Sequence, residues 1–165
     1  MQSREELESW YTTEDPWDYR TNPDDIYRKN FYLAVLEDVG PFFHRALDIG
    51  AGEGWITKDL PADEKHAFEL TDAAASRLPE GVERVEQITQ KYDLILATGV
   101  MYEQYDHIAI NQMIHHAASE THGTMIMIAG IKDWLIPYSY GMIHRHYEIP
   151  YREYQHVISV WEYLP

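Results

Sequence analysis

The chain has 165 residues, 45% of them hydrophobic, which is enough for one domain with a substantial core. Its 28 acidic residues outnumber its 13 basic ones, so the formal net charge is −15. Proteins that bind a phosphate backbone need clustered lysines and arginines, and this sequence has no such run, so we expect no nucleic-acid partner. The absence of cysteine excludes disulfides and thiolate metal sites.

No stretch approaches the ~20 apolar residues of a membrane span, and the polar start over residues 1–6 is unlike a signal peptide. We therefore expect a cytoplasmic protein with no membrane partner, present as a monomer or a homodimer. The acidic net charge suits a neutral or cationic small-molecule substrate better than an anionic one.

Residues 1–25 are polar but carry four large aromatic side chains, which predicts an ordered arm because disordered tails contain few aromatics. The sequence Asn22-Pro23-Asp24-Asp25 then indicates the start of a helix. The elements expected after it, in chain order, are a helix over 24–38, a strand over 45–49, a short helix over 55–60, a strand over 66–70, a short helix over 72–78, a strand over 82–85, a buried strand over 92–97, an amphipathic helix over 108–120, a strand over 124–129, a loop or short helix over 131–142, and two strands over 144–149 and 156–161.

Strands and helices alternate through most of this order, which predicts an α/β fold with a mostly parallel sheet and helices on both faces. The last two strands lie close together in the sequence and are expected to form an antiparallel hairpin. Because neither a linker nor an internal repeat is visible, residues 1–165 are interpreted as one domain.

The most informative stretch is Ala46–Gly54, where a short apolar strand with an acid near its end runs into glycines at 50, 52 and 54. Glycine permits the tight turn and the close approach of a ligand. A dinucleotide fingerprint, G-x-G-x-x-G, would place its third glycine at 55, where the chain has Trp55, and this disfavours an NAD-dependent oxidoreductase. The pattern G-x-G-x-G instead resembles motif I of class I S-adenosylmethionine (SAM)-dependent methyltransferases, which implies a Rossmann-like SAM-binding domain.

Several acidic or polar residues are candidates for holding SAM. Glu69 closes a predicted strand 21 residues after Asp48, near the ~20-residue spacing of a ribose-binding acid, with Asp72 as the alternative. By the resemblance, Asp48 orders the glycine loop and approaches the SAM amino group; otherwise it only braces the loop. The adenine candidates after the third strand are Glu86 and Gln87.

A narrower resemblance covers about residues 15–130. The sequence Asp-Pro-Trp-Asp-Tyr-Arg at 15–20, Tyr-Arg-Lys at 27–29, the glycine loop and the strand with its sequel at 92–102 together resemble the nodulation-protein S type of small N-methyltransferases. This chain has Thr98-Gly99 where Ser-Glu is usual in that type, and it is short after the fifth strand.

The resemblance implies that the arm and following helix, residues 1–40, fold over the cofactor. It places Trp17 beside SAM, gives Arg28 or Lys29 as the partner of the SAM carboxylate, and puts Thr98 among the cofactor-binding residues. A cation fits this role because the carboxylate is the one anionic group of SAM.

The acceptor side is expected at the carboxyl ends of the strands. Tyr102 and Glu103 follow the fourth strand, where they would orient an amine or attract a cationic acceptor, and each is equally interpreted as a packing or solvated residue. His144 is a candidate general base. The remaining candidates are Trp134 and Tyr138 as lining residues and a metal-binding pair at His144 and His146; because no third ligand is evident, we expect no metal.

The sequence thus predicts SAM-dependent methyl transfer to a small-molecule acceptor, with a nitrogen acceptor slightly favoured over oxygen. The alternative from a different class is a SAM-fold binding module that lacks transfer activity and acts through a protein partner.

Overall fold

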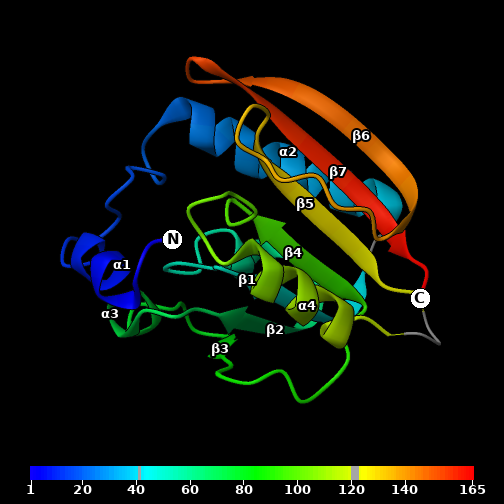
Figure 1. Ribbon diagram of the computed structural model, residues 1–165, viewed down its shortest axis with the longest axis horizontal. Helices are drawn as coiled ribbons and strands as arrows, with labels where there is room; N and C mark the ends of the chain where they lie inside the picture. Colours follow the sequence, from blue (N-terminus) through cyan, green and yellow to red (C-terminus); the bar gives the residue numbers. More distant parts are fainter. Residues whose placement is uncertain (41, 120–122) are drawn as a thin grey trace.

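The structure is a computed structural model that describes residues 1–40, 42–119 and 123–165. Its described strands form one seven-stranded sheet in the order β3-β2-β1-β4-β5-β7-β6 (Figure 1). The strands are β1 (Phe43–Ile49), β2 (Ala62–Phe68), β3 (Val82–Arg84), β4 (Leu94–Thr98), β5 (Met125–Ile131), β6 (Gly141–Tyr151) and β7 (Tyr154–Tyr163).

The pairing confirms the predicted fold class. β1 to β5 pair in parallel, whereas β7 runs antiparallel to β5 and forms a hairpin with β6. The carboxyl ends of the parallel strands therefore lie at the same end of the sheet as the turn of the hairpin.

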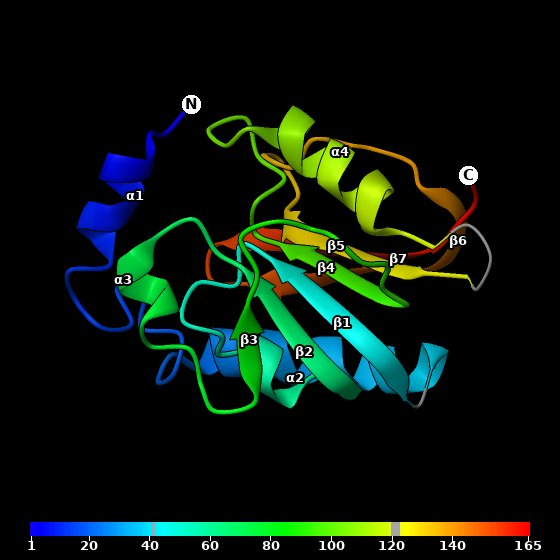
Figure 2. The same cartoon turned by 90° about the horizontal axis from the view of Figure 1, so that it is seen from below.

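Two helices cover opposite faces of the sheet, as Figure 2 shows: α2 (Pro23–Val39) lies on one face and α4 (His107–Ala117) on the other. Successive residues of a strand point to opposite faces, so Ala46 packs in the core under α2 while Leu47 packs in the core under α4. This alternation explains why the central strands are apolar on both faces.

The intervening helices are shorter than predicted. The helix expected over 55–60 is a single 3₁₀ turn, η1 (Thr57–Asp59), and the one expected over 72–78 is α3 (Asp72–Ala75). Strand β2 begins at Ala62, four residues before the predicted start, because its pairing with β1 continues through a polar stretch. The last residue of the helix predicted over 108–120 lies outside the described residues.

The N-terminal arm contains a helix that the sequence analysis did not predict, α1 (Arg4–Trp10). Ser3 and Glu6 form a capping box at its start, each side chain bonding the other's backbone N–H. The Glu8 carboxylate accepts hydrogen bonds from the backbone N–H groups of Asp72 and Ala73. These bonds hold α1 against α3, beyond the carboxyl ends of the strands (Figure 2).

Among the helices of the described residues, none combines the length and apolar character needed to cross a membrane.

Candidate cofactor and acceptor site

A cavity of about 740 Å³ opens at the carboxyl ends of the parallel strands. Its volume falls within the ~300–1,000 Å³ range of small-molecule sites. One end, here called the glycine-loop end, consists of residues 48–53 and Glu69; the other, here called the hairpin end, consists of residues 151–156 with Asp25 and Arg28. Asp25, Glu153 and Gln155 do not line the cavity, and the other residues of the two ends do.

The glycine loop is shaped by backbone conformations that disfavour side chains. Gly50 and Gly52 have φ values of +73° and +56°. A Cβ on Gly50 would overlap the Val100 side chain, and one on Gly52 would lie 2.8 Å from the Tyr11 hydroxyl. Both glycines line the cavity, whereas Gly54 does not; its turn packs against Leu78 and Pro79 instead.

Glu69 lies one residue beyond the end of β2 and lines the cavity. One of its carboxylate oxygens accepts a hydrogen bond from Gly52 N at 2.8 Å, and the other accepts bonds from the backbone and side chain of Thr71. Glu69 therefore fixes the loop and presents a carboxylate beside it. The alternative acid, Asp72, is exposed, pairs with Arg4 and Arg84, and does not line the cavity.

Asp48 is buried at the junction between β1 and the loop, and it lines the cavity. Its carboxylate accepts a 2.7 Å hydrogen bond from the Thr57 hydroxyl. Burial raises the pKa of Asp48 to about 7, and the Glu69 carboxylate adds to the increase, against the lowering effect of the Thr57 bond. The site therefore contains an acid that can change its charge near neutral pH.

Glu53 connects the loop to the N-terminal arm, a role that the sequence analysis missed. Its buried carboxylate accepts hydrogen bonds from the backbone N–H of Asp15 and from the guanidinium groups of Arg20 and Arg77. Arg77 also donates to the Tyr11 carbonyl at 2.9 Å. These bonds hold the arm over the cavity.

The arm presents aromatic side chains to the cavity. Trp17 lines it and stacks on Trp10 with 4.9 Å between ring centroids. Tyr11 lies over Gly52, as described above. The helix that follows the arm, α2, is expected from the sequence to fold over the cofactor. In the structure it packs on the sheet, and Arg28 is its residue that lines the cavity.

Arg28 and Lys29, the two cations predicted as partners of the SAM carboxylate, have different surroundings in the structure. Arg28 is buried in the cavity wall, where it pairs with Asp25 at 3.0 Å and faces the rings of Tyr19 and Tyr151. Lys29 instead donates to the Trp55 carbonyl and pairs with Asp59, and it does not line the cavity. Of these two cations, Arg28 is therefore the one that lines the cavity.

Asp25 organises the hairpin end. Its fully buried carboxylate accepts hydrogen bonds from Arg28, from the Tyr151 hydroxyl at 2.9 Å and from Arg152 at 2.7 Å. Two guanidinium groups thus share one buried carboxylate at this end of an otherwise acidic protein.

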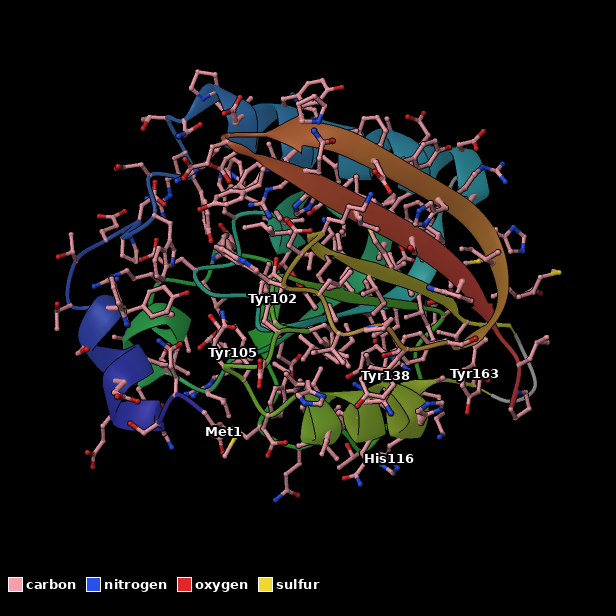
Figure 3. The ribbon with its side chains drawn as sticks, turned by 45° about the horizontal axis from the view of Figure 1, so that its top comes forward. Met1, Tyr102, Tyr105, His116, Tyr138 and Tyr163 are labelled. Carbon is pink, nitrogen blue, oxygen red and sulfur yellow. The ribbon has the colours of Figure 1, made fainter. Side chains whose placement is uncertain are left out.

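Thr98, the last residue of β4, lines the cavity, and so do Tyr102 and Tyr105 in the segment that follows. The Tyr102 hydroxyl accepts a 2.6 Å hydrogen bond from Ile131 N, which ties this segment to the end of β5. Figure 3 shows Tyr102 and Tyr105 between β4 and α4, with Met1 on the same side of the molecule. Of the two predicted lining residues, Trp134 lines the cavity and Tyr138 bonds His107 instead.

Besides Gly54, three predicted site residues lie away from the cavity. Glu103 is exposed on the segment after β4, and Gln87, like its alternative Glu86, is exposed after β3. His144 lies at the opposite end of β6, where it bonds Glu162 at 2.9 Å. Because β6 leads toward the cavity instead of away from it, its first residues are its most distant ones. We therefore leave these three out of the proposed site.

His144 and His146 also do not form a metal site: in the part of the chain that the structure describes, no group of three histidine or acidic side chains is arranged to hold a metal ion.

The histidine that does line the cavity is His156, in β7, and the sequence analysis did not single it out. It pairs with Ile131 across the β5–β7 ladder, at the carboxyl end of β5. Tyr151 and Tyr154, at the turn of the hairpin, line the cavity with it. Only the strand direction, which follows from the hairpin, could have indicated these residues.

No protein-family model and no curated protein matches the sequence, but solved structures match the fold. NodS, an N-methyltransferase from Bradyrhizobium japonicum WM9 solved with S-adenosyl-L-homocysteine (SAH), superposes with a TM-score of 0.80 at 15% identity, covering 97% of each chain. The 1,6-didemethyltoxoflavin-N1-methyltransferase of Burkholderia thailandensis, solved with bound 1,6-didemethyltoxoflavin and SAH, gives a TM-score of 0.68 at 15% identity, covering 98% of this chain and 87% of that one. The plantazolicin methyltransferase BpumL gives 0.53 at 19% identity, covering 78% and 57%. The chain therefore has the fold of class I SAM-dependent methyltransferases and resembles NodS over nearly its whole length.

Proposed function

We propose that this protein transfers a methyl group from SAM to a small-molecule acceptor, with nitrogen favoured over oxygen. The observation that carries the proposal is the unit of Gly52 and Glu69: the N–H of a glycine in the left-handed conformation donates to the carboxylate one residue beyond β2, and both residues line the same cavity. A side chain at Gly52 would block the approach of a ligand to the backbone. The Glu69 carboxylate beside it is placed to accept hydrogen bonds from the ribose hydroxyls.

The remaining residues fit the other groups of SAM. The Asp48 carboxylate fits the ammonium group, Arg28 fits the carboxylate, and the Trp17 ring fits an apolar contact beside the cofactor. When bound, SAM supplies an electrophilic methyl group on a sulfonium. What the chain must add is alignment of the acceptor and exclusion of water.

The cavity supports transfer over mere binding. It continues from the glycine loop past β4 and β5 to the hairpin end, which leaves room for a second molecule beside the cofactor. A nitrogen acceptor is favoured because a neutral amine needs no protein base. The predicted base, His144, lies outside the cavity, and burial lowers the pKa of His156, which lines it, to about 3, so His156 is a weak base. The methyltransferases of similar fold include two named for N-methylation.

The first test is calorimetric titration of the protein with SAM and SAH, beside Glu69→Gln and the matched control Asp72→Asn. Glu69→Gln keeps an oxygen for Gly52 but removes the charge, so we expect at least tenfold weaker binding; Asp72→Asn should bind as the wild type does. A folded protein that binds neither molecule would contradict the proposal.

Turnover separates transfer from the alternative of a binding module. We expect SAH to accumulate when the protein and SAM are incubated with a panel of primary and secondary aromatic amines. SAM binding without SAH release on any member of an amine and phenol panel would favour a module acting through a partner.

A further inference from the structure

We propose that Tyr105 positions the methyl acceptor and that this acceptor is an aromatic amine, whose N–H group donates to the Tyr105 hydroxyl oxygen while its ring packs against Trp134. The proposal rests on the proposed function, because it assigns the acceptor half of the same cavity.

Tyr105 follows the strand that lies between the cofactor residues and Trp134. In the sheet, β4 lies between β1, which leads into the glycine loop, and β5, which ends at Ile131, shortly before Trp134. The ring of Tyr102 lies 6.5 Å from that of Tyr105 and 6.2 Å from that of Trp134, between centroids. All three rings line the cavity, and Figure 3 shows Tyr105 beside Tyr102. A molecule lying along Tyr102 can therefore contact both Tyr105 and Trp134.

The Tyr105 hydroxyl is open to the cavity. Six tyrosines line the cavity, and the hydroxyls of four of them are bonded to other groups of the protein: Tyr11 to Trp17, Tyr102 to Ile131 N, Tyr151 to Asp25 and Tyr154 to Glu153. A fifth, Tyr19, belongs to the arm and lies beside Arg28, which is assigned above to the SAM carboxylate. The Tyr105 hydroxyl has no partner within the described residues and is not one of their enclosed polar atoms, so a molecule in the cavity can reach it.

The electrostatic surroundings of Tyr105 agree with this orientation. Burial raises the pKa of Tyr105, and the charge of the Glu69 carboxylate raises it further. Tyr105 in turn raises the pKa values of Tyr11 and Tyr19. Glu69, Tyr11 and Tyr19 all line the cavity, so the groups that interact with the Tyr105 hydroxyl lie around the same space. The raised pKa also keeps the hydroxyl protonated at neutral pH, and Tyr105 is therefore not a general base.

The chemistry of transfer decides how an amine bonds this hydroxyl. A neutral phenol can donate one hydrogen bond and can also accept. The amine reacts through its lone pair, which must point at the methyl group, so what it offers to Tyr105 is an N–H. As the N–CH₃ bond forms and the C–S bond of SAM breaks, the electron pair of the C–S bond stays on sulfur and the nitrogen becomes positive; the product ammonium then loses its proton to water. The N–H donates more strongly as this charge develops, so the hydrogen bond to Tyr105 is strongest in the transition state.

Trp134 gives the acceptor side a flat apolar wall. It lines the cavity but is 46% exposed, and its ring packs against Tyr154 at 5.0 Å between centroids as well as against Tyr102. Its backbone N–H donates to the Ile131 carbonyl at 3.1 Å, which holds it at the end of β5. A large aromatic side chain left half exposed in a cavity favours a ligand ring, because burying it there removes apolar surface from water. Trp134 and Tyr105 together favour an aromatic amine over an aliphatic one.

The test compares two probes of the same two-ring shape, indoline and 2,3-dihydrobenzofuran, of which the first alone carries an N–H. Binding of each probe is measured by ligand-observed NMR titration in the presence of saturating SAH. We expect the wild type to bind indoline about five- to tenfold more tightly, the effect of one neutral hydrogen bond. Tyr105→Phe should bind the two probes equally and keep the SAH affinity of the wild type. Trp134→Leu should weaken the binding of both probes to the same extent.

Tyr138→Phe is the matched control, because its hydroxyl bonds His107 and the residue does not line the cavity; it should keep the preference for indoline. Tyr105→Phe removes no hydrogen bond within the described residues, so it should fold as the wild type does. Equal binding of the two probes by the wild type, a preference retained in Tyr105→Phe, probe binding unaffected by Trp134→Leu, or no binding of either probe by a protein that binds SAH would overturn the assignment. Failure of the proposed function is distinct, since it appears as absent SAH binding.

Kinetics with the best amine of the turnover panel separate positioning from binding alone. Because the hydrogen bond is strongest in the transition state, kcat should fall roughly tenfold or more in Tyr105→Phe and stay unchanged in Tyr138→Phe. A rise in KM with an unchanged kcat in Tyr105→Phe would contradict the positioning role.

Discussion

The two ends of the cavity are built in different ways. The glycine-loop end comes from one short run of residues whose backbone conformation is the functional feature, with Glu69 added from the next strand. The hairpin end is a side-chain network in which Asp25 and Tyr151, 126 residues apart in the sequence, share a hydrogen bond. The first end depends on the absence of side chains, and the second depends on their pairing.

This difference separates the expected consequences of mutation. At the glycine-loop end a change should block a ligand more than it unfolds the protein. At the hairpin end a change should remove the partners of buried charges, and stability should fall with it.

The largest effect is expected for Gly50→Ala. The residue has a φ of +73° and no room for a Cβ beside Val100, so the loop must move and SAH binding should fall more than a hundredfold. Gly81→Ala is the matched control, because its φ is +83° but no atom lies within 4 Å of the added Cβ. Calorimetric titration of both with SAH isolates the clash from the conformational strain. Similar losses in the two variants would contradict the role of the loop.

At the hairpin end, Asp25→Asn should lower the free energy of unfolding by about 3–5 kcal/mol, as is typical when one partner of a buried ion pair is removed. Arg28 and Arg152 would lose their shared carboxylate. Asp38→Asn removes the exposed pair with Arg145 and should leave the free energy of unfolding nearly unchanged. Urea denaturation measures both. A cost below ~1 kcal/mol for Asp25→Asn would show that the network does not stabilise the fold.

The contrast also explains what the sequence could reveal. The order of strands, the glycine loop and Glu69 follow from local patterns, because each lies in a continuous stretch whose periodicity or spacing is visible. The helix α1 could have been found in the same way, from Ser3 and Glu6, which form its capping box. The hairpin end could not, since it depends on the three-dimensional approach of α2 and the β6–β7 hairpin.

A smaller effect, dependent on pH, tests Asp48. Its pKa of about 7 exceeds the ordinary value of 3.8, so the folded state holds a proton between these values that the unfolded state has lost. Stability should therefore fall as the pH rises from about 4 to about 7 and stay constant above that. Asp48→Asn should remove this slope, which urea denaturation at several pH values measures.

The same carboxyl group should couple SAM binding to proton release. An ammonium group beside Asp48 favours the ionised acid, so at pH 6 binding should release up to one proton and affinity should increase toward pH 7. Titrations in two buffers of different ionisation enthalpy count the protons. Identical heats in both buffers would show that Asp48 does not interact with the ligand. Its role would then be to brace the loop through its hydrogen bond with Thr57.

The smallest effect is expected for His144→Ala. This variant tests whether the two ends of the β6–β7 hairpin differ in function. His144 and His156 belong to neighbouring strands, yet only His156 reaches the cavity, because β6 runs toward it and β7 away from it. His144→Ala removes a partly exposed pair with Glu162, so stability should change by ~1 kcal/mol or less and SAH affinity should stay within about twofold of the wild type. A methyl-transfer rate that falls in His144→Ala would contradict this placement of the cavity, since it would put the acceptor at the opposite end of the hairpin.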